Sequence, residues 1–381
     1  MAKTAKIELI EGNILASLQG FFKALLEDGG IDALLVPQHL PMKNTVMPTL
    51  VTDSEKINGL DPLAPVFPTN AAKVVSRLTR RPMGGRVAVV LRPCEIRAFI
   101  ELVKLKQGKM DDVVLVGTDC YGAYSNVDYS RFAGDDDTGS TLRFYQNVRS
   151  GKGTTWEDFD LSPACKACEY PVAENADLLI GLIGVDTDDH LLVKANTFEG
   201  EALLEELGLP GMKEPEGRKA AIESLVKERV AYRDRMFQET TDATDDIKKL
   251  TTYLGNCVNC YNCRVACPVC YCKECVFQTD VFDHEPSQYL RWAKHKGILK
   301  MPTDTVFFHL TRLAHMSTAC IGCGQCSNAC PNNIPVMEVF RTVANYTQKA
   351  FDYEAGRSVE DDPPLSAFQE AEFRELTGEK D

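Results

Sequence analysis

The sequence predicts an α/β domain followed by a second, mainly α-helical domain, and two patterns support this. Residues 86–116 read as a strand, a helix and a second strand, the order expected of a parallel sheet. Residues 245–350 instead combine helical segments with closely spaced cysteines. A chain of 381 residues is also longer than one ordinary core. We therefore expect domains at 1–240 and 241–350, followed by an acidic C-terminal arm at 351–381.

Helices and strands are predicted to alternate along the first domain. Six prolines between residues 37 and 68 predict a loop without long regular elements, because proline lacks an amide donor. Residues 133–160 are polar and Gly-rich, and a surface excursion is expected there. The acidic tail at 358–381 is expected to be extended. The expected elements are helices at 7–27 (stopped by Gly29-Gly30), 70–81, 95–106 and a linking helix at 218–239, strands at 31–36, 86–91, 113–116 and 178–185, and a short strand and helix within 190–207.

Charge and composition exclude several classes of protein. Lys and Arg number 42 against 55 Asp and Glu, and the formal charge of −13 argues against nucleic-acid binding. A hydrophobic share of 44% is too high for a disordered chain. No run approaches 18 apolar residues, and residues 1–11 show no export signal, so we expect a cytoplasmic protein with no membrane span. Its fifteen cysteines then read as metal ligands before disulfides.

Two cysteine runs share the pattern Cys-x2-Cys-x2-Cys-x3-Cys-Pro, which is the ligand pattern of a pair of 4Fe-4S clusters. The first three cysteines of such a run hold one cluster, and the fourth reaches the other cluster in two-cluster ferredoxins. Zinc knuckles are the alternative, but zinc sites favour two Cys-x2-Cys pairs. The predicted ligands are Cys257, Cys260, Cys263 and Cys330 for cluster 1, and Cys320, Cys323, Cys326 and Cys267 for cluster 2.

The segment between the two runs contains helix-like stretches at 288–296 and 306–314. Together with Cys320-Ile-Gly-Cys-Gly-Gln-Cys-Ser-Asn-Ala-Cys-Pro, it resembles the α-helical ferredoxin module of succinate dehydrogenase and heterodisulfide reductase subunits. Three further cysteines follow the first run, and alternative cluster ligands, a small extra metal site or plain packed thiols would each account for them. They are Cys270, Cys272 and Cys275.

Four cysteines of the first domain remain. Cys94 and Cys120 each follow a predicted strand, at the sheet edge where open α/β folds bind ligands. The pair Cys165 and Cys168 could close a four-thiolate site over them, although a lone cysteine is more often an ordinary buried thiol.

The motifs around these cysteines resemble a known family. They are Leu91-Arg-Pro-Cys-Glu-Ile-Arg-Ala, Gly117-Thr-Asp-Cys-Tyr, and Cys165-Lys-Ala-Cys-Glu-Tyr followed by Ala176-Asp-Leu-Leu-Ile-Gly-Leu-Ile-Gly. Their order, over about residues 70–200, resembles the β subunit of coenzyme F420-reducing hydrogenase and F420-dependent formate dehydrogenase. The resemblance implies a 4Fe-4S cluster (cluster 3) on Cys94, Cys120, Cys165 and Cys168, beside a bound FAD. It also implies hydride exchange between the flavin and a deazaflavin, with single electrons passing to a partner subunit.

The residues themselves indicate a flavin only weakly. No Gly-x-Gly-x-x-Gly follows a strand, which argues against a Rossmann flavin site. Arg92 and Arg97 flank Cys94 and could stabilise a reduced flavin or cluster, or else form surface ion pairs. A basic group near Gly84-Gly85 could receive a pyrophosphate, but favourable cations at a helix C-terminus are the preferred reading. This group comprises Arg77, Arg80, Arg81 and Arg86. The six histidines show no ligand pairing with the cysteines and are expected to be structural or exposed.

The sequence thus predicts a flavin- and iron–sulfur-containing subunit of a cytoplasmic oxidoreductase complex. FAD would exchange hydride with a deazaflavin or NAD(P)H, and three 4Fe-4S clusters would relay single electrons. The partner would be a formate dehydrogenase, hydrogenase or heterodisulfide-reductase-like subunit. Two alternatives remain open: a flavin-free iron–sulfur relay, and a zinc-bearing scaffold without a redox role.

Overall fold

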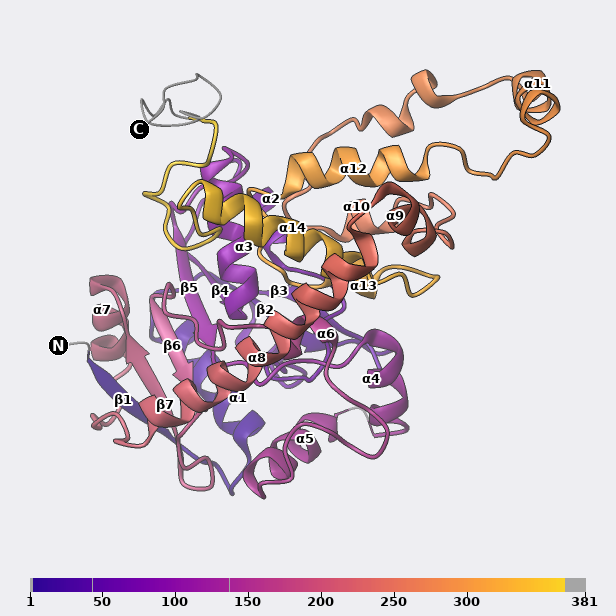
Figure 1. Ribbon diagram of the computed structural model, residues 1–381. Coiled ribbons are helices and arrows are strands. Elements are labelled where there is room, and N and C mark those ends of the chain that lie inside the picture. The colour runs from indigo at the N-terminus through magenta and orange to yellow at the C-terminus, as the bar shows by residue number, and fades with distance from the viewer. Residues whose placement is uncertain (1–2, 43, 137, 367–381) are drawn as a thin grey trace, which may run out of the picture.

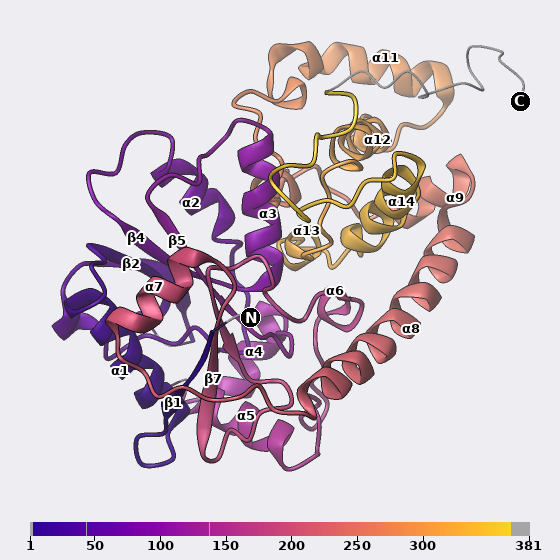
Figure 2. The same ribbon diagram turned by 90° about the vertical axis from the view of Figure 1, so that its left-hand side faces the viewer.

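The computed structural model describes residues 3–42, 44–136 and 138–366. Figures 1 and 2 show a sheet covered by helices and a group of helices on the side of α3, joined to it by one long helix. That long helix is α8 (Arg218–Thr244), where the sequence predicts a linking helix. The prediction of an α/β region followed by a mainly helical region that bears the cysteine runs is therefore confirmed.

A seven-stranded mixed sheet, in the order β1-β7-β6-β5-β4-β2-β3, forms the first region. Its central strands β2, β4, β5 and β6 are parallel, as the strand–helix–strand pattern predicts. The outer pairs β1–β7, β7–β6 and β2–β3 are antiparallel. The strands are β1 (Thr4–Glu8), β2 (Ala33–His39), β3 (Val46–Val51), β4 (Val87–Leu91), β5 (Val113–Thr118), β6 (Leu178–Gly181) and β7 (His190–Ala195).

The helices divide into two groups along the chain. The first group surrounds the sheet and comprises α1 (Ile14–Glu27), α2 (Ala72–Leu78), α3 (Pro93–Lys104), α4 (Asn126–Ala133), α5 (Ser140–Arg149), α6 (Pro163–Lys166) and α7 (Phe198–Glu206). The second follows α8 and comprises α9 (Ile247–Tyr253), α10 (Asn262–Ala266), α11 (Pro286–Lys296), α12 (Thr305–Met316), α13 (Gln325–Asn328) and α14 (Val336–Ala350). Short 3-10 turns are η1 (Ser54–Lys56), η2 (Val276–Gln278) and η3 (Asp280–Phe282).

The sheet separates two apolar cores, because successive side chains of a strand point to opposite faces. In β4, Ala88 and Val90 face one core, which α1, α5 and α7 cover. Val89 and Leu91 face the other, which α2 and α3 cover. Ile321 of the helical region also belongs to this second core, so the two regions share apolar contact.

The helix predicted at 7–27 is shorter than expected, and its first residues form a strand instead. Residues Thr4–Glu8 pair with β7 as β1, a partner far away in sequence that local periodicity cannot reveal. The Asn13 side chain accepts hydrogen bonds from the amides of Leu15 and Ala16, so the helix begins at Ile14.

The proline-rich segment also contains more regular structure than predicted. Strand β2 continues through Pro37, and Pro48 lies opposite it in β3. The sheet tolerates both prolines, because β3 is an edge strand and the pairing of β2 with β4 ends at Leu35.

Two further predictions need correction. The excursion expected at 133–160 contains α5, whose Phe144 and Tyr145 are buried in the first core. The strand expected at 178–185 ends at Gly181, because the amides of Leu182 and Ile183 turn to donate to the Asp119 carboxylate, at 2.8 and 2.9 Å.

The predicted C-terminal arm begins as packed chain. Tyr353 and Ala355 are buried against α3, and the Gly356 amide donates to Glu101 Oε1 at 2.6 Å. Residues 367–381 of the expected arm lie outside the described residues. Among the described residues, no helix is both long enough and apolar enough to cross a bilayer.

Candidate iron–sulfur sites and their surroundings

The first set of thiols gathers at the carboxyl ends of neighbouring parallel strands. Leu91 of β4 pairs with Gly117 of β5, so Cys94 and Cys120 emerge at the same edge of the sheet. Cys94 lies in the first turn of α3, and the Glu95 carboxylate anchors that turn by accepting from the Arg92 and Ala71 amides. Burial, and then the neighbouring Glu95 carboxylate, raise the pKa of Cys94 well above its usual range.

Cys165 and Cys168 join this edge through the segment around α6. The Cys120 amide donates to the Pro171 carbonyl at 2.8 Å, and the Ala123 amide donates to Cys165 Sγ at 3.3 Å. Burial, partly offset by the Arg92 charge and reinforced by charge on Cys165 and Cys168, raises the pKa of Cys120 to about 11. The structure therefore brings together the four cysteines expected for cluster 3.

Arg229 of α8 fixes the backbone of this set, and the sequence did not single it out. This buried guanidinium donates to the carbonyls of Tyr121 at 2.7 Å, Cys120 at 3.2 Å and Cys168 at 3.5 Å. Arg229 lies more than a hundred residues from Cys120 on a helix rich in charge, so no local pattern distinguishes it. The helix α8 therefore not only links the two regions but also holds the backbone around Cys120 and Cys168 in place.

The second set gathers in the helical region. Cys257, Cys260, Cys263 and Cys330 line one shared pocket with Phe308 and His309. Burial raises the pKa values of Cys257 and Cys263, and mutual repulsion among these thiols adds to the effect. These are the four cysteines expected for cluster 1, including the one from the other run.

The third set comprises the thiols of the second run that lie near Cys267 of the first run. Burial raises the pKa of Cys320 to about 11 and that of Cys326 well above its usual range. For both thiols, and for Cys323, the next largest cause is charge on Cys267 of the first run. The structure therefore groups Cys267 with the second run, as expected for cluster 2.

A buried arginine lies between these two sets. Arg312 of α12 donates to Cys263 Sγ at 3.0 Å and to the Cys263 carbonyl at 3.1 Å. Burial opposes its charge, but the thiols of Cys263, Cys267 and Cys326 outweigh it and raise the pKa of Arg312. The guanidinium also lies over the rings of Phe308 and Phe340, which shield it from water.

His309 is a buried structural residue that lies beside one of the cysteines. Its Nε2 lies 3.4 Å from Cys257 Sγ. Burial, and then the Arg312 charge, lower the pKa of His309 to about 4. The ring is therefore neutral at pH 7.

Cys94 connects the sheet edge to the helical region. Charge on Cys323 is among the causes that raise the pKa of Cys94, so the sets expected for clusters 2 and 3 adjoin.

Other contacts also join the two regions. Gly324 packs against Ala164 with a φ of +77°, a conformation and a proximity that exclude larger residues. Glu169 next to Cys168 forms ion pairs with Arg233 of α8 and Arg341 of α14.

The two arginines expected near a flavin differ in their surroundings. Arg92 faces the thiols of Cys120, Cys94 and Cys165. Its Nη2 donates to the Ala64 carbonyl at 2.6 Å. Its buried Nη1 has no hydrogen-bond partner in the described part of the chain. Arg97 instead donates to the Ala355 carbonyl at 2.6 Å and stacks on Tyr170.

The basic group near Gly84-Gly85 lies at the opposite end of β4 from Cys94. Arg80 donates to Gln107, and Arg86 pairs with Glu199. Arg77 lies in the last turn of α2, the position of a favourable cation at a helix C-terminus.

A hollow of about 450 Å³ lies where the two regions meet, between Cys323 and Ala164. The rings of Phe67 and Tyr124 and several hydroxyl and amide groups line it. The described residues that line it include two carboxylates, Asp128 and Glu338, and no Lys or Arg. The hollow therefore suits the ring system of a flavin but not its pyrophosphate, which would have to lie beyond it.

The unassigned cysteines occupy different environments. Cys270 lies near Cys267 and Cys272, and burial raises its pKa to about 11. Cys275 packs with Phe277, whereas Cys272 is exposed. Across the described residues, no three or more His, Cys, Asp or Glu side chains converge closely enough to hold a single metal ion.

Comparisons with known proteins cover both regions of the chain. Residues 84–214 match the family model for the C terminus of the coenzyme F420 hydrogenase/dehydrogenase beta subunit, and residues 253–334 match the 4Fe-4S dicluster domain. The F420-dependent formate dehydrogenase subunit beta of Methanocaldococcus jannaschii is 26% identical over 349 residues, covering 85% of this chain and 87% of the relative. The F420-dependent formate dehydrogenase 1 subunit beta of Methanococcus maripaludis is 26% identical over 387 residues, covering 93% and 94%.

Among solved structures, one similar chain belongs to the F420-reducing [NiFe] hydrogenase complex from Methanosarcina barkeri, studied by xenon derivatization. It is 17% identical, with a TM-score of 0.47, and the match covers 65% of this chain and 93% of that chain.

The two matched regions and their cysteine sets define an iron–sulfur oxidoreductase subunit. More particularly, residues 84–214 match the beta subunit family of coenzyme F420 hydrogenase/dehydrogenase, and residues 253–334 match a 4Fe-4S dicluster domain. The family resemblance expected from the motifs is thereby confirmed.

Proposed function

We propose that this chain is the flavin- and iron–sulfur-containing electron-transfer subunit of a cytoplasmic oxidoreductase complex. The observation that carries this proposal is the continuity of the three cysteine sets. Cys94 of one set neighbours Cys323 of the next, and Arg312 contacts Cys263 while its charge reaches Cys267 and Cys326. Clusters at such adjoining sites would form a single path for electrons.

The chain's own residues fit 4Fe-4S clusters as ligands. Each set supplies four thiols, and thiolates are the ligands of such clusters. Nearby cations would offset the negative charge of a thiolate-bound cluster: Arg92 beside the sheet-edge set and Arg312 between the other two. We propose the ligand sets expected from the sequence for clusters 1, 2 and 3, in domains divided at about residues 240 and 350.

FAD would supply the exchange between a hydride and two single electrons. We propose that its ring system occupies the hollow of about 450 Å³ between Cys323 and Ala164, where Phe67 and Tyr124 offer aromatic faces. Burial raises the pKa of Glu338 in this hollow, which favours its neutral form beside an electron-rich ring. The buried Arg92, stacked on Phe67, would add a positive charge close to the ring.

The similarity to F420-dependent formate dehydrogenase subunits supports a deazaflavin as the hydride carrier, with NAD(P)H as the alternative. We propose that the single electrons pass to or from another redox subunit of the formate dehydrogenase, hydrogenase or heterodisulfide-reductase type. Cys257 and Cys260 lie at the end of the path farthest from the sheet edge and would serve that exchange.

The test is to purify the chain without oxygen, release its organic cofactors by denaturation and identify them by chromatography. About one FAD per chain, with flavin bleaching by reduced F420 or NAD(P)H, is the expected result. Iron without flavin would support the alternative, an iron–sulfur relay that works without an organic cofactor. Zinc without iron would overturn both.

A further inference from the structure

Two hollows in the helical region adjoin Cys257, the first cysteine of the first run. A hollow of about 420 Å³ and a second, more open one of about 540 Å³ both include Cys257 in their lining. Cys260 of the same set is exposed, whereas the other proposed ligands are buried or half-buried. This set is therefore the one closest to solvent, and a partner could approach it most directly.

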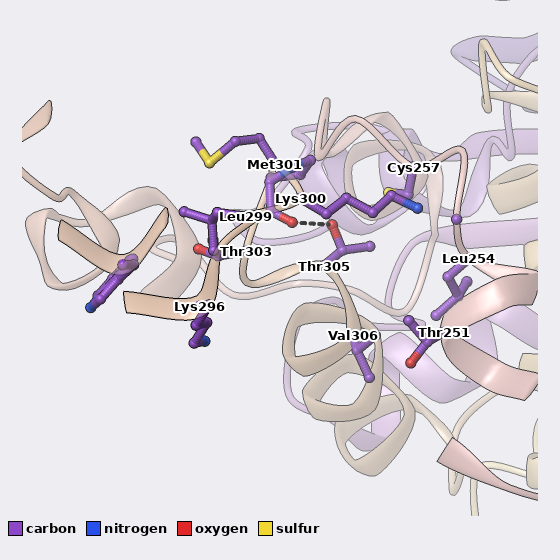
Figure 3. A pocket seen from close by; sticks show the side chains of 13 residues that line it. Thr251, Leu254, Cys257, Lys296, Leu299, Lys300, Met301, Thr303, Thr305 and Val306 are labelled. Carbon is purple, nitrogen blue, oxygen red and sulfur yellow. Dashed lines mark hydrogen bonds between the residues drawn. The ribbon is translucent and has the colours of Figure 1, made fainter. Parts of the chain in front are cut away.

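Residues 286–303, which include α11 and which we call the basic arm, project from the helical region beside these hollows. Figures 1 and 2 show α11 standing away from the rest of the helical region, and none of its residues is buried. The connection from α11 to α12 returns along the hollow at Cys257. Figure 3 shows Lys300 of this connection reaching toward Cys257. The Lys300 Nζ also lies close to Gly255, 3.3 Å from the position that a Cβ on that glycine would occupy.

The arm is basic, although the whole chain carries a formal charge of −13. Residues 286–303 contain no Asp or Glu, and their cations are Arg291, Lys294, Lys296 and Lys300. Within the described residues, none of these four makes an ion pair, whereas buried arginines such as Arg218 and Arg341 are paired. These four cations give residues 286–303 a local positive charge between the flanking carboxylates of Glu285 and Asp304, and such a positive stretch attracts a negative surface.

Apolar side chains accompany these charges. Leu290 is 71% exposed, Ile298 80% and Met301 54%. Met301 also lines both hollows at Cys257. Apolar residues at the centre with a charged rim are the usual composition of a protein–protein interface.

We propose that this surface, which we call the arm face (residues 286–303 with the two hollows at Cys257), binds an acidic protein that carries a one-electron redox centre. The inference rests on the proposed function, because it needs a cluster on the set that includes Cys257. One electron then passes between that cluster and the partner's centre: the donor is oxidised by one electron and the acceptor is reduced by one. No proton moves and no covalent bond changes.

The test uses the full chain, purified with its cofactors, and an acidic plant-type [2Fe–2S] ferredoxin as the probe. The charge variant is R291Q/K294Q/K296Q/K300Q. The matched control, K152Q/K213Q/K219Q/K227Q, removes the same charge from exposed lysines outside the arm face. Binding is measured by biolayer interferometry over a range of ionic strength, and hydrogen exchange with and without the probe locates the protected residues.

We expect wild type to bind the probe with an affinity that falls as salt rises, and the charge variant to bind about ten-fold more weakly at low salt. The control variant should stay close to wild type, and protection should appear within residues 286–303. Absence of binding by wild type, equal losses in both variants, or protection elsewhere would each overturn the arm face as the docking surface.

Iron content and flavin reduction by the hydride donor, measured on the same samples, separate the two levels of the proposal. Intact iron and flavin reduction with an unaffected charge variant would reject the arm face alone. Absence of iron would instead reject the proposed function, whatever the binding result.

Discussion

Replacement of Arg312 by glutamine should lower the reduction potentials of clusters 1 and 2. The Arg312 guanidinium donates to Cys263 Sγ at 3.0 Å, and its charge also reaches Cys267 and Cys326. A buried positive charge favours the more negative, reduced form of each cluster. Glutamine keeps a polar side chain of moderate length but removes that charge.

The size of the shift in potential follows from the hydrogen bond and, independently, from the charge. A hydrogen bond to a charged group contributes about 1.5–3 kcal/mol. A unit charge at roughly 6 Å, with an effective dielectric constant of about 20, contributes about 2.8 kcal/mol. Since 1.4 kcal/mol corresponds to about 59 mV for one electron, a decrease of roughly 60–120 mV is expected.

Potentiometric titration followed by electron paramagnetic resonance measures these potentials directly. Arg312→Lys, which keeps the charge, should shift them less than Arg312→Gln, and Arg235→Gln on the exposed side of α8 should leave them unchanged. Equal potentials in wild type and Arg312→Gln, at the same iron content, would refute the role of this charge.

Other substitutions test the surroundings of the sites. Arg229→Met should lower iron content by about four atoms per chain, one cluster's worth, because the carbonyls of Cys120, Tyr121 and Cys168 lose their shared donor; Arg229→Lys should lose less, and full iron in the Met variant would contradict this. Gly324→Ala should destabilise the chain by roughly 1–3 kcal/mol, because the new Cβ meets Ala164 at a positive φ; thermal unfolding measures this, and an unchanged melting temperature would count against the close packing. Glu338→Gln should raise the melting temperature at pH 7. Burial raises the pKa of Glu338, so ionisation of the carboxyl destabilises the fold as pH rises through that pKa. The gain in melting temperature should therefore vanish well below pH 4.5, where the carboxyl is protonated in both the folded and the unfolded chain. A gain that persists at low pH would exclude ionisation as its cause.

The sequence was most informative about the cluster ligands, because their spacing along the chain is local. The runs beginning at Cys257 and Cys320 predict their own grouping, because two-residue spacers and the terminal proline restrict how the chain can fold around a cluster. The crossing of Cys267 to the second run followed from the same pattern. Cys94 and Cys120 were expected together because both follow neighbouring parallel strands, and the sheet register places them at one edge.

Contacts between distant segments could not be predicted in this way. Strand β1 forms only because β7, nearly two hundred residues later, supplies its partner. In the sequence, Arg229 and Arg312 look like ordinary helical arginines. Only the tertiary fold brings Arg229 to the backbone carbonyls around Cys120 and Arg312 to the Cys263 thiol. Tyr353 and Ala355 were expected in an acidic arm, but the apolar face of α3 covers them.

The most direct test of the account is to count and characterise the clusters in chain purified without oxygen. Iron analysis combined with electron paramagnetic resonance of the dithionite-reduced protein should give about 12 iron atoms per chain and spectra broadened by interaction between neighbouring clusters. Cys94→Ala should remove about four of these iron atoms and leave the dicluster signals in place. About eight iron atoms in wild type, with no change in Cys94→Ala, would contradict a continuous path of three clusters.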